Sequence, residues 1–163
     1  MWTPTPGQVK ALMPARVDGR AFAADTTPTL NQVGQVAGSI VDDVEAAVAP
    51  LLTDPSDPTV VRPLPAALFP MAVRAATLGA AADVEYGFWP EQQDGPDASG
   101  PRFERRYKEA LERLMAAVGA YYAVDDAAAA ATAADGFVGS METPLVSVVT
   151  PYIPGVERVL WLR

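Results

Sequence analysis

Apolar positions in the middle of the first half of the chain predict a long amphipathic helix. They recur at intervals of three and four residues, which is the spacing of one helix face. They are Leu30, Val33, Ala37, Ile40, Val44, Ala47 and Leu51. Thr27 and Pro28 fit the N-cap and the first position of this helix, and we expect it to end at Pro50 or just after it.

A shorter helix is predicted nearer the N-terminus. Thr5 fits as its N-cap, Pro6 fits its first helical position, and Pro14 ends it. In the loop that follows, Phe22 is the only large apolar residue. We expect its side chain to fill part of the core.

The third predicted helix covers residues 64–88 and is apolar on every side. Pro65 and Pro70 both fit near its start, and a start at Pro65 would leave Pro70 as a kink. Between residues 71 and 84 only two side chains carry a charge. A helix that is apolar all round is a buried one, so we expect this helix at the centre of a bundle.

The fourth predicted helix begins near residues 99–101 and ends at about Tyr122. Its apolar stripe comprises Phe103, Tyr107, Leu111, Leu114, Val118 and Tyr121. Its other face sets opposite charges four residues apart, as Glu104 with Lys108, Arg105 with Glu109, and Glu109 with Arg113. Such pairs contribute only a few tenths of a kcal/mol each, but they are typical of a solvated helix face.

The chain changes character after Tyr122. An alanine-rich run over residues 125–134 is followed by glycines, and residues 145–149 form a short β-branched run between prolines. We therefore predict a mainly α protein: a small bundle of about four helices over residues 1–122, and an extended C-terminal arm over residues 123–163 that contains one short β-strand.

A single strand cannot form a sheet alone, and the sequence offers no second convincing one. The arm is therefore expected to pair with another chain, by adding its strand to the edge of a neighbour's sheet. The arm also ends in apolar residues, and aromatic side chains are enriched at the centres of interfaces. The predicted partner-binding residues are Leu145, Val146, Val148, Val149, Tyr152, Ile153, Leu160 and Trp161.

Composition removes most enzyme chemistries. The 163 residues include no cysteine and no histidine, which excludes disulfides, thiolate or imidazole metal ligands and Ser–His or Cys nucleophiles. A net charge of −8 disfavours tight binding of a phosphate backbone over a broad face. Neither a signal peptide nor a membrane-spanning run is predicted. We expect a soluble protein made in a cytoplasm, with no cofactor and no catalytic activity.

Basic residues concentrate in the fourth predicted helix. Arg102, Arg105, Arg106 and Arg113 lie there with glutamates between them, which neutralise much of the patch. We therefore favour a subunit interface over a nucleic-acid contact for these four arginines.

Two other function classes stay open at this point. Asp42, Glu45, Asp83 and Glu85 are carboxylates of a kind that binds Mg²⁺, so a small helical metal hydrolase is one alternative. A regulatory module that holds one partner through its tail is the other. Gly34 and Gly38 lie one turn apart, which would let another helix approach closely.

The layout of the chain resembles the head-to-tail adaptor proteins of tailed phages, most closely those of phages that infect actinobacteria. The resemblance covers residues 1–122. It is carried by Met-Trp-Thr-Pro-Thr-Pro at the start, Phe-Ala-Ala-Asp-Thr-Thr-Pro-Thr at 22–29, the segment 74–92, and Phe-Glu-Arg-Arg-Tyr-Lys at 103–108. The order and spacing of the helices contribute most of it.

The resemblance implies a structural virion protein of the phage neck. Adaptors are small helical bundles that form a twelve-fold ring beneath the portal protein and continue the DNA channel towards the stopper and tail. They have no catalytic residues, and genomic DNA passes through the channel without specific binding. Their C-terminal segment grips the portal, and this role maps onto the residues after Tyr122, where the present chain is longer than a minimal adaptor.

Overall fold

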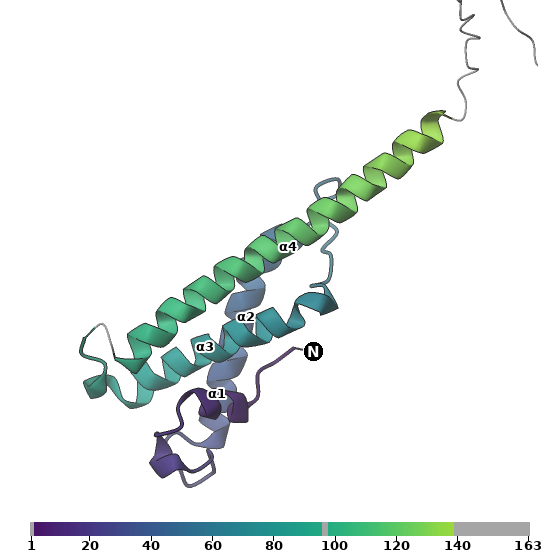
Figure 1. The fold of residues 1–163 in the computed structure, drawn as a ribbon. Coiled ribbons are helices and arrows are strands. Elements are labelled where there is room, and N and C mark those ends of the chain that lie inside the picture. Colours follow the sequence, from purple (N-terminus) through teal and green to yellow (C-terminus); the bar gives the residue numbers. More distant parts are fainter. Residues whose placement is uncertain (1, 96–97, 139–163) are drawn as a thin grey trace, which may run out of the picture. The chain divides into compact units, whose positions relative to one another are not determined.

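The computed structural model describes residues 2–95 and 98–138, with side chains as far as residue 127. Residues 1–127 form one compact unit, and residues 128–163 belong to a second. The elements are α1 (Pro6–Leu12), η1 (Val17–Gly19), α2 (Leu30–Leu52), η2 (Ala66–Leu68), α3 (Phe69–Phe88), η3 (Pro90–Gln92) and α4 (Ser99–Val138), where η marks a 3₁₀ helix (Figure 1). The prediction of a mainly helical protein is confirmed for these residues.

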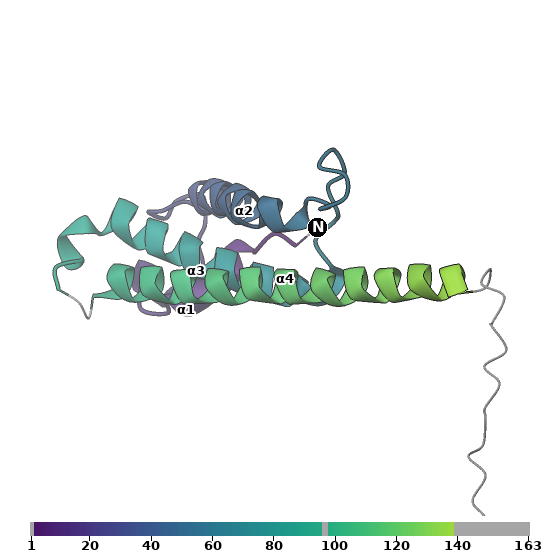
Figure 2. The ribbon, with the colours of Figure 1, turned by 90° about the horizontal axis from the view of Figure 1, so that it is seen from above.

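α3 is the central helix of the unit, as its all-round apolarity predicts. It packs against α1 and α2, and in Figure 2 α2 runs along one side of the unit and α4 along the other. Its buried residues fall on every side of the helix: Ala72, Ala75, Ala76, Thr77, Leu78, Gly79, Ala80, Ala81, Ala82, Val84 and Glu85. Because most of them are small, three neighbouring helices can approach its backbone.

The start of α3 settles the role of the two prolines near it. Pro65 precedes η2, and Pro70 occupies the first turn of α3. The first-turn N–H groups have no partner inside a helix, so a proline there costs no hydrogen bond. Pro70 therefore begins the helix and does not kink it.

One stretch of the described residues, Ala66–Phe88, is long and apolar enough to cross a membrane by length and composition. In the structure more than half of its most apolar 18-residue segment is buried inside the unit. Its place at the centre of the bundle accounts for its apolarity.

α2 begins two residues later than the sequence predicts. Thr29, not Thr27, is the N-cap, because its hydroxyl accepts the Gln32 N–H (3.2 Å) and the Gln32 side chain accepts the Thr29 N–H (2.9 Å). This reciprocal capping box satisfies two backbone donors, which a proline at the first position does not do. Pro28 lies before the helix, after a cis peptide bond. The end of α2 at Leu52, just after Pro50, agrees with the prediction.

The N-terminal segment folds as predicted. Thr5 caps α1 through the same kind of capping box, with Gln8, and the helix ends before Pro14. Phe22 is buried in the core, as expected for the large apolar residue of its loop, and Trp2 is buried as well.

α4 begins at Ser99 as predicted but continues far beyond Tyr122, to Val138. The alanine-rich run continues the helix because alanine has the highest helix propensity. The first part of the predicted extended arm, residues 123–138, is therefore helical.

The predicted stripe of α4 is correct except at its end. Phe103, Leu114 and Val118 are buried, whereas Tyr121 is 47% exposed. The half-buried Tyr122 takes its place, since a step of four residues from Val118 keeps to the helix face better than a step of three here.

A close helix approach in the unit occurs at Gly79, and neither Gly34 nor Gly38 provides one. A Cβ built on Gly79 would come within 2.7 Å of Ile40 of α2 and 3.3 Å of the Tyr107 ring of α4. A Cβ built on Gly34 or on Gly38 would have no atom of another residue within 4 Å, apart from its neighbours along the helix. α2, α3 and α4 therefore meet at Gly79, where the side chain is only a hydrogen atom.

The predicted strand at residues 145–149 and the eight predicted partner-binding residues of the arm lie outside the described residues. Within the described ranges the structure has no named strand, and its β-type pairing is a bridge between Thr53 and Val61.

Candidate functional site

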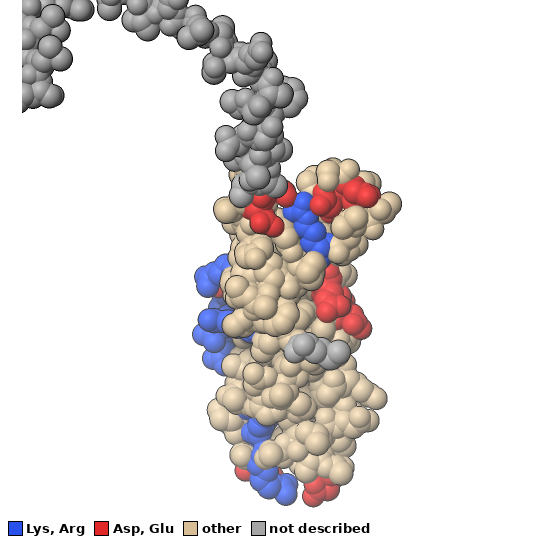
Figure 3. Space-filling view, turned by 90° about the vertical axis from the view of Figure 1, so that its right-hand side faces the viewer, with Lys and Arg blue, Asp and Glu red and all other residues tan. Residues whose placement is uncertain are grey.

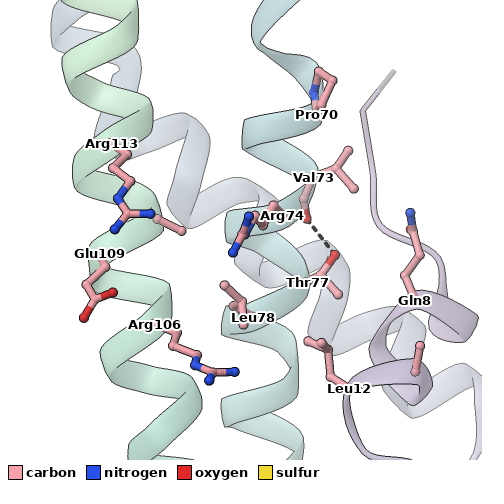
Figure 4. A pocket seen from close by; sticks show the side chains of 12 residues that line it. Gln8, Leu12, Pro70, Val73, Arg74, Thr77, Leu78, Arg106, Glu109 and Arg113 are labelled. Carbon is pink, nitrogen blue, oxygen red and sulfur yellow. Dashed lines mark hydrogen bonds between the residues drawn. The ribbon is translucent and has the colours of Figure 1, made fainter.

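An open groove of about 530 Å³ lies between α1, α3 and α4. Its apolar lining includes Leu12 of α1, Val73 and Leu78 of α3, and Ala110 of α4. Figure 4 shows α3 between the other two helices, with Leu12 approaching from α1.

Three arginines surround this apolar floor: Arg74 of α3 and Arg106 and Arg113 of α4. In Figure 4 the Arg106 guanidinium lies between α4 and α3, the Arg74 guanidinium lies at the edge of α3 that faces α4, and the Arg113 guanidinium lies over α4. None of them has an ion pair within the described part of the chain. We name this feature, the apolar floor with its three arginines, the arginine groove.

One carboxylate, Glu109, also lines the groove, but Figure 4 places it on the side of α4 away from α3. The Thr77 hydroxyl donates its proton to the Val73 carbonyl oxygen (2.6 Å), so this proton is not free to bind an anionic group. Guanidinium groups bind carboxylates and phosphates through paired hydrogen bonds. The arginine groove thus suits an anionic group attached to a small apolar one.

The sequence predicts Arg102, Arg105, Arg106 and Arg113 as interface residues, and all four are exposed. Only Arg106 and Arg113 belong to the groove; the Arg102 guanidinium lies 5.4 Å from the Phe103 ring centre instead. Arg74, which completes the groove, was not among the predicted residues. It sits on the central helix, far from the others in sequence, so no local pattern marks it.

Of the three charge pairs predicted on α4, one forms. Lys108 Nζ lies 2.6 Å from Glu104 Oε1. No ion pair joins Glu109 to Arg105 or Arg113 within the described residues. The arginines of the groove therefore have no ion-pair partner among the described residues.

The four carboxylates proposed as metal ligands do not come together. Asp42, Glu45 and Asp83 are exposed, whereas Glu85 is buried and bound to Arg16. In the described residues no three carboxylates are grouped so that they could hold a metal ion.

Asp83 lies instead near Asp43 and Glu104. Desolvation, together with these two negative charges, raises the pKa of the Asp83 carboxyl above its ordinary value. The pKa of the Tyr107 hydroxyl beside them is raised by burial and by Asp43 and Asp83. At mid-height of Figure 3, Lys and Arg lie along the left edge of the unit and Asp and Glu along the right edge, so opposite charges gather at opposite edges of this face.

A buried cluster around Arg16 joins the loop after α1 to the end of α3. Arg16 donates from Nε to Glu85 Oε1 (2.9 Å) and from Nη2 to Glu85 Oε2 (2.5 Å), and Glu85 is only 1% exposed. The Arg16 guanidinium also lies 4.7 Å from the Trp89 ring centre and donates to Gln92. We call these residues, with Gln93, which donates to Glu85 (3.0 Å), the Arg16 cluster.

A second cluster lies near the end of the unit and ties loop 53–62 to α4. Arg62 Nη2 lies 2.9 Å from Asp54 Oδ2 and 2.8 Å from Asp126 Oδ1, and its guanidinium stacks 4.9 Å from the Tyr122 ring centre. The Tyr122 hydroxyl donates to the Pro63 carbonyl oxygen. We call Arg62, Asp54, Tyr122 and Asp126 the Arg62 cluster. Hydrogen bonds from the Ser56 hydroxyl and N–H, and then the Arg62 guanidinium, hold the pKa of Asp54 well below its ordinary range. Asp126 and Asp54 raise the pKa of Arg62.

The chain matches no protein-family model, no curated protein and no solved structure.

Proposed function

We propose that this protein is a head-to-tail adaptor of a tailed phage. It forms a ring between the portal and the stopper or tail, continues the DNA channel, and docks on the portal or on a neighbouring subunit through its C-terminal arm. It acts as a structural protein of the virion neck and performs no catalysis.

The observation that carries the proposal is where the adaptor-like segments lie in the fold. Residues 22–29 contribute the buried Phe22 and the cap of α2. Residues 74–92 supply most of the central helix and three members of the Arg16 cluster. The segments that resemble adaptors are therefore those that organise the unit, which favours a shared architecture over a chance likeness of surface residues.

The distribution of charge also suits a conduit. The chain carries −8 overall, and a negatively charged channel wall repels the phosphate backbone, so DNA slides past without binding. The arginine groove is a locally basic feature of this acidic chain. A groove of this kind can accept an acidic surface of another protein, as ring assembly requires.

The proposal is tested by cryo-electron microscopy of the neck of the phage particle whose genome encodes this chain. The expected result is a ring of this chain beneath the portal, with density that accommodates α1 to α4. A neck built completely from other proteins would overturn the proposal.

The docking role of the arm is tested with the portal ring of the same particle. We expect the full chain to bind the purified portal in mass photometry, and a chain that ends at Val138 to lose this binding. As a control of equal length, the apolar residues at 145, 146, 148 and 149 are exchanged for serine, and binding is again expected to fail. Undiminished binding by both variants would assign portal attachment to the helical unit instead.

A further inference from the structure

Loop 53–62 presents an acidic and apolar tip to solvent. Val60 and Val61 are 46% and 67% exposed, among the most exposed large apolar side chains of the described residues. Asp57 is exposed beside them, and it forms no ion pair within the described part of the chain. The two exposed valines could contact the apolar floor of the arginine groove, and the carboxylate could pair with its arginines.

The loop holds this shape through its own hydrogen bonds. Asp57 Oδ1 accepts from the Thr59 N–H (2.9 Å) and hydroxyl (2.6 Å), and the same arrangement joins Asp54 to Ser56. The backbone N–H of Asp54 donates to the Val60 carbonyl oxygen (3.0 Å). A loop ordered in advance loses little conformational freedom on binding, which favours association. The Thr59 hydrogen bonds also lower the pKa of Asp57, so its charge persists in mildly acidic solution.

We propose that loop 53–62 of one copy of this chain docks in the arginine groove of the next copy. Asp57 faces Arg74, Arg106 and Arg113, and Val60 and Val61 cover the apolar floor. The inference rests on the proposed ring assembly and names the contact that would build it.

Two matches single out a second copy as the occupant. The groove lining carries three arginines and one glutamate, a local excess of positive charge on a chain whose net charge is −8. The loop carries an unpaired acid and two exposed valines, which match that excess and the apolar floor. Loop and groove are different patches of one unit, so each copy offers one of each, and repetition of such a contact generates a ring when the rotation closes.

The absence of cysteine in the sequence allows a direct test by disulfide trapping. Val61→Cys is introduced in one preparation of the full chain and Ala11→Cys, in the groove wall, in another. The two are mixed at about millimolar concentration, where even a weak contact is populated, and oxidised with copper phenanthroline. We expect the mixed disulfide to form at least about tenfold faster than with the control Ala46→Cys, an exposed alanine on α2 outside the groove.

Charge and geometry give two further readouts. Arg74→Glu with Arg106→Glu is expected to reduce the Val61–Ala11 cross-link to the control rate, as is about 1 M salt. A chain carrying both Val61→Cys and Ala11→Cys is expected to give a ladder of products above the dimer. Equal rates with Ala11→Cys and Ala46→Cys would overturn the inference, and products that stop at the dimer would overturn its head-to-tail form.

The outcome for the contact is separate from the outcome for the function. A ring of this chain in the phage neck, together with equal cross-linking rates, would reject the loop-and-groove contact alone. A specific cross-link in solution, together with a neck that lacks this chain, would reject the adaptor function and keep the contact.

Discussion

The Arg16 and Arg62 clusters use the same chemistry at different depths. In each, a guanidinium with less than a fifth of its side-chain surface exposed lies less than 5 Å from an aromatic ring centre and pairs with carboxylate oxygens. The carboxylate side chain is 2% exposed at Glu85, but 22% and 44% exposed at Asp54 and Asp126.

This difference in burial decides how much the loss of one partner costs. A buried charge that loses its partner cannot be rehydrated, so breaking the Arg16–Glu85 pair from one side strongly destabilises the core. The carboxylates of the Arg62 cluster can be rehydrated, so that cluster fixes a position and contributes less to global stability.

The largest effect is expected from Arg16→Ala. It leaves the Glu85 carboxylate buried without its main partner, which lowers the free energy of unfolding by about 3–5 kcal/mol. Urea denaturation measures the loss. As a control, Arg16→Met with Glu85→Leu removes both charges and is expected to recover most of the stability. If Arg16→Ala lowered the free energy of unfolding no more than an ordinary surface substitution does, the burial of Glu85 would not distinguish the Arg16 cluster from the Arg62 cluster.

A smaller effect is expected from Arg62→Ala, because both carboxylates that it releases reach solvent. Thermal unfolding in low salt should show a modest decrease in Tm. In about 1 M salt, where charges are screened beyond about 3 Å, this difference should nearly vanish, whereas that of Arg16→Ala should persist. The same salt response in both variants would contradict the contrast in burial.

The smallest effect concerns pH and Asp54. Its pKa lies below the ordinary 3.8 in the folded protein, so its contribution to stability is complete above that value and is lost as the pH falls through the lowered pKa. We expect Tm to fall on acidification below about pH 4, and Asp54→Asn to flatten this fall. The pKa values of Asp57 and Glu104 are also lowered, so these two carboxyls are expected to cause the fall of Tm with pH that remains in Asp54→Asn. If Tm fell equally with pH in the wild-type protein and in Asp54→Asn, Asp54 would not contribute to the loss of stability in acid.

The helices could be predicted from the sequence because their signals are local. Periodic apolar positions identify α2 and α4, and the uniform apolarity of α3 identifies the centre of the bundle. The start of α2 differs from the prediction because the capping box of Thr29 and Gln32, a pattern that is also readable in the sequence, outweighs the preference of proline for the first helical position. α4 extends beyond its predicted end because the alanine-rich run after Tyr122, which was predicted to be a spacer, has a high helix propensity.

The clusters and the groove could not be predicted because their members lie far apart in the chain. Arg16 and Glu85 are separated by 69 positions in the sequence. Arg62 and Asp126 are separated by all of α3 and by most of α4. Arg74 joins Arg106 and Arg113 only when α3 and α4 pack. No spacing rule links such residues, and the contacts follow from tertiary packing alone.

The position of Asp126 has a mechanical consequence. α4 is one helix from Ser99 to Val138, and the Arg62 guanidinium binds it at Asp126, next to the last residue of the first unit. Tension applied to the chain beyond residue 127 therefore reaches an ion pair before it reaches the core. Because the same guanidinium also binds Asp54, this force is transmitted to the base of loop 53–62. Pulling on the C-terminal segment would thus strain the surface through which one copy would hold the next.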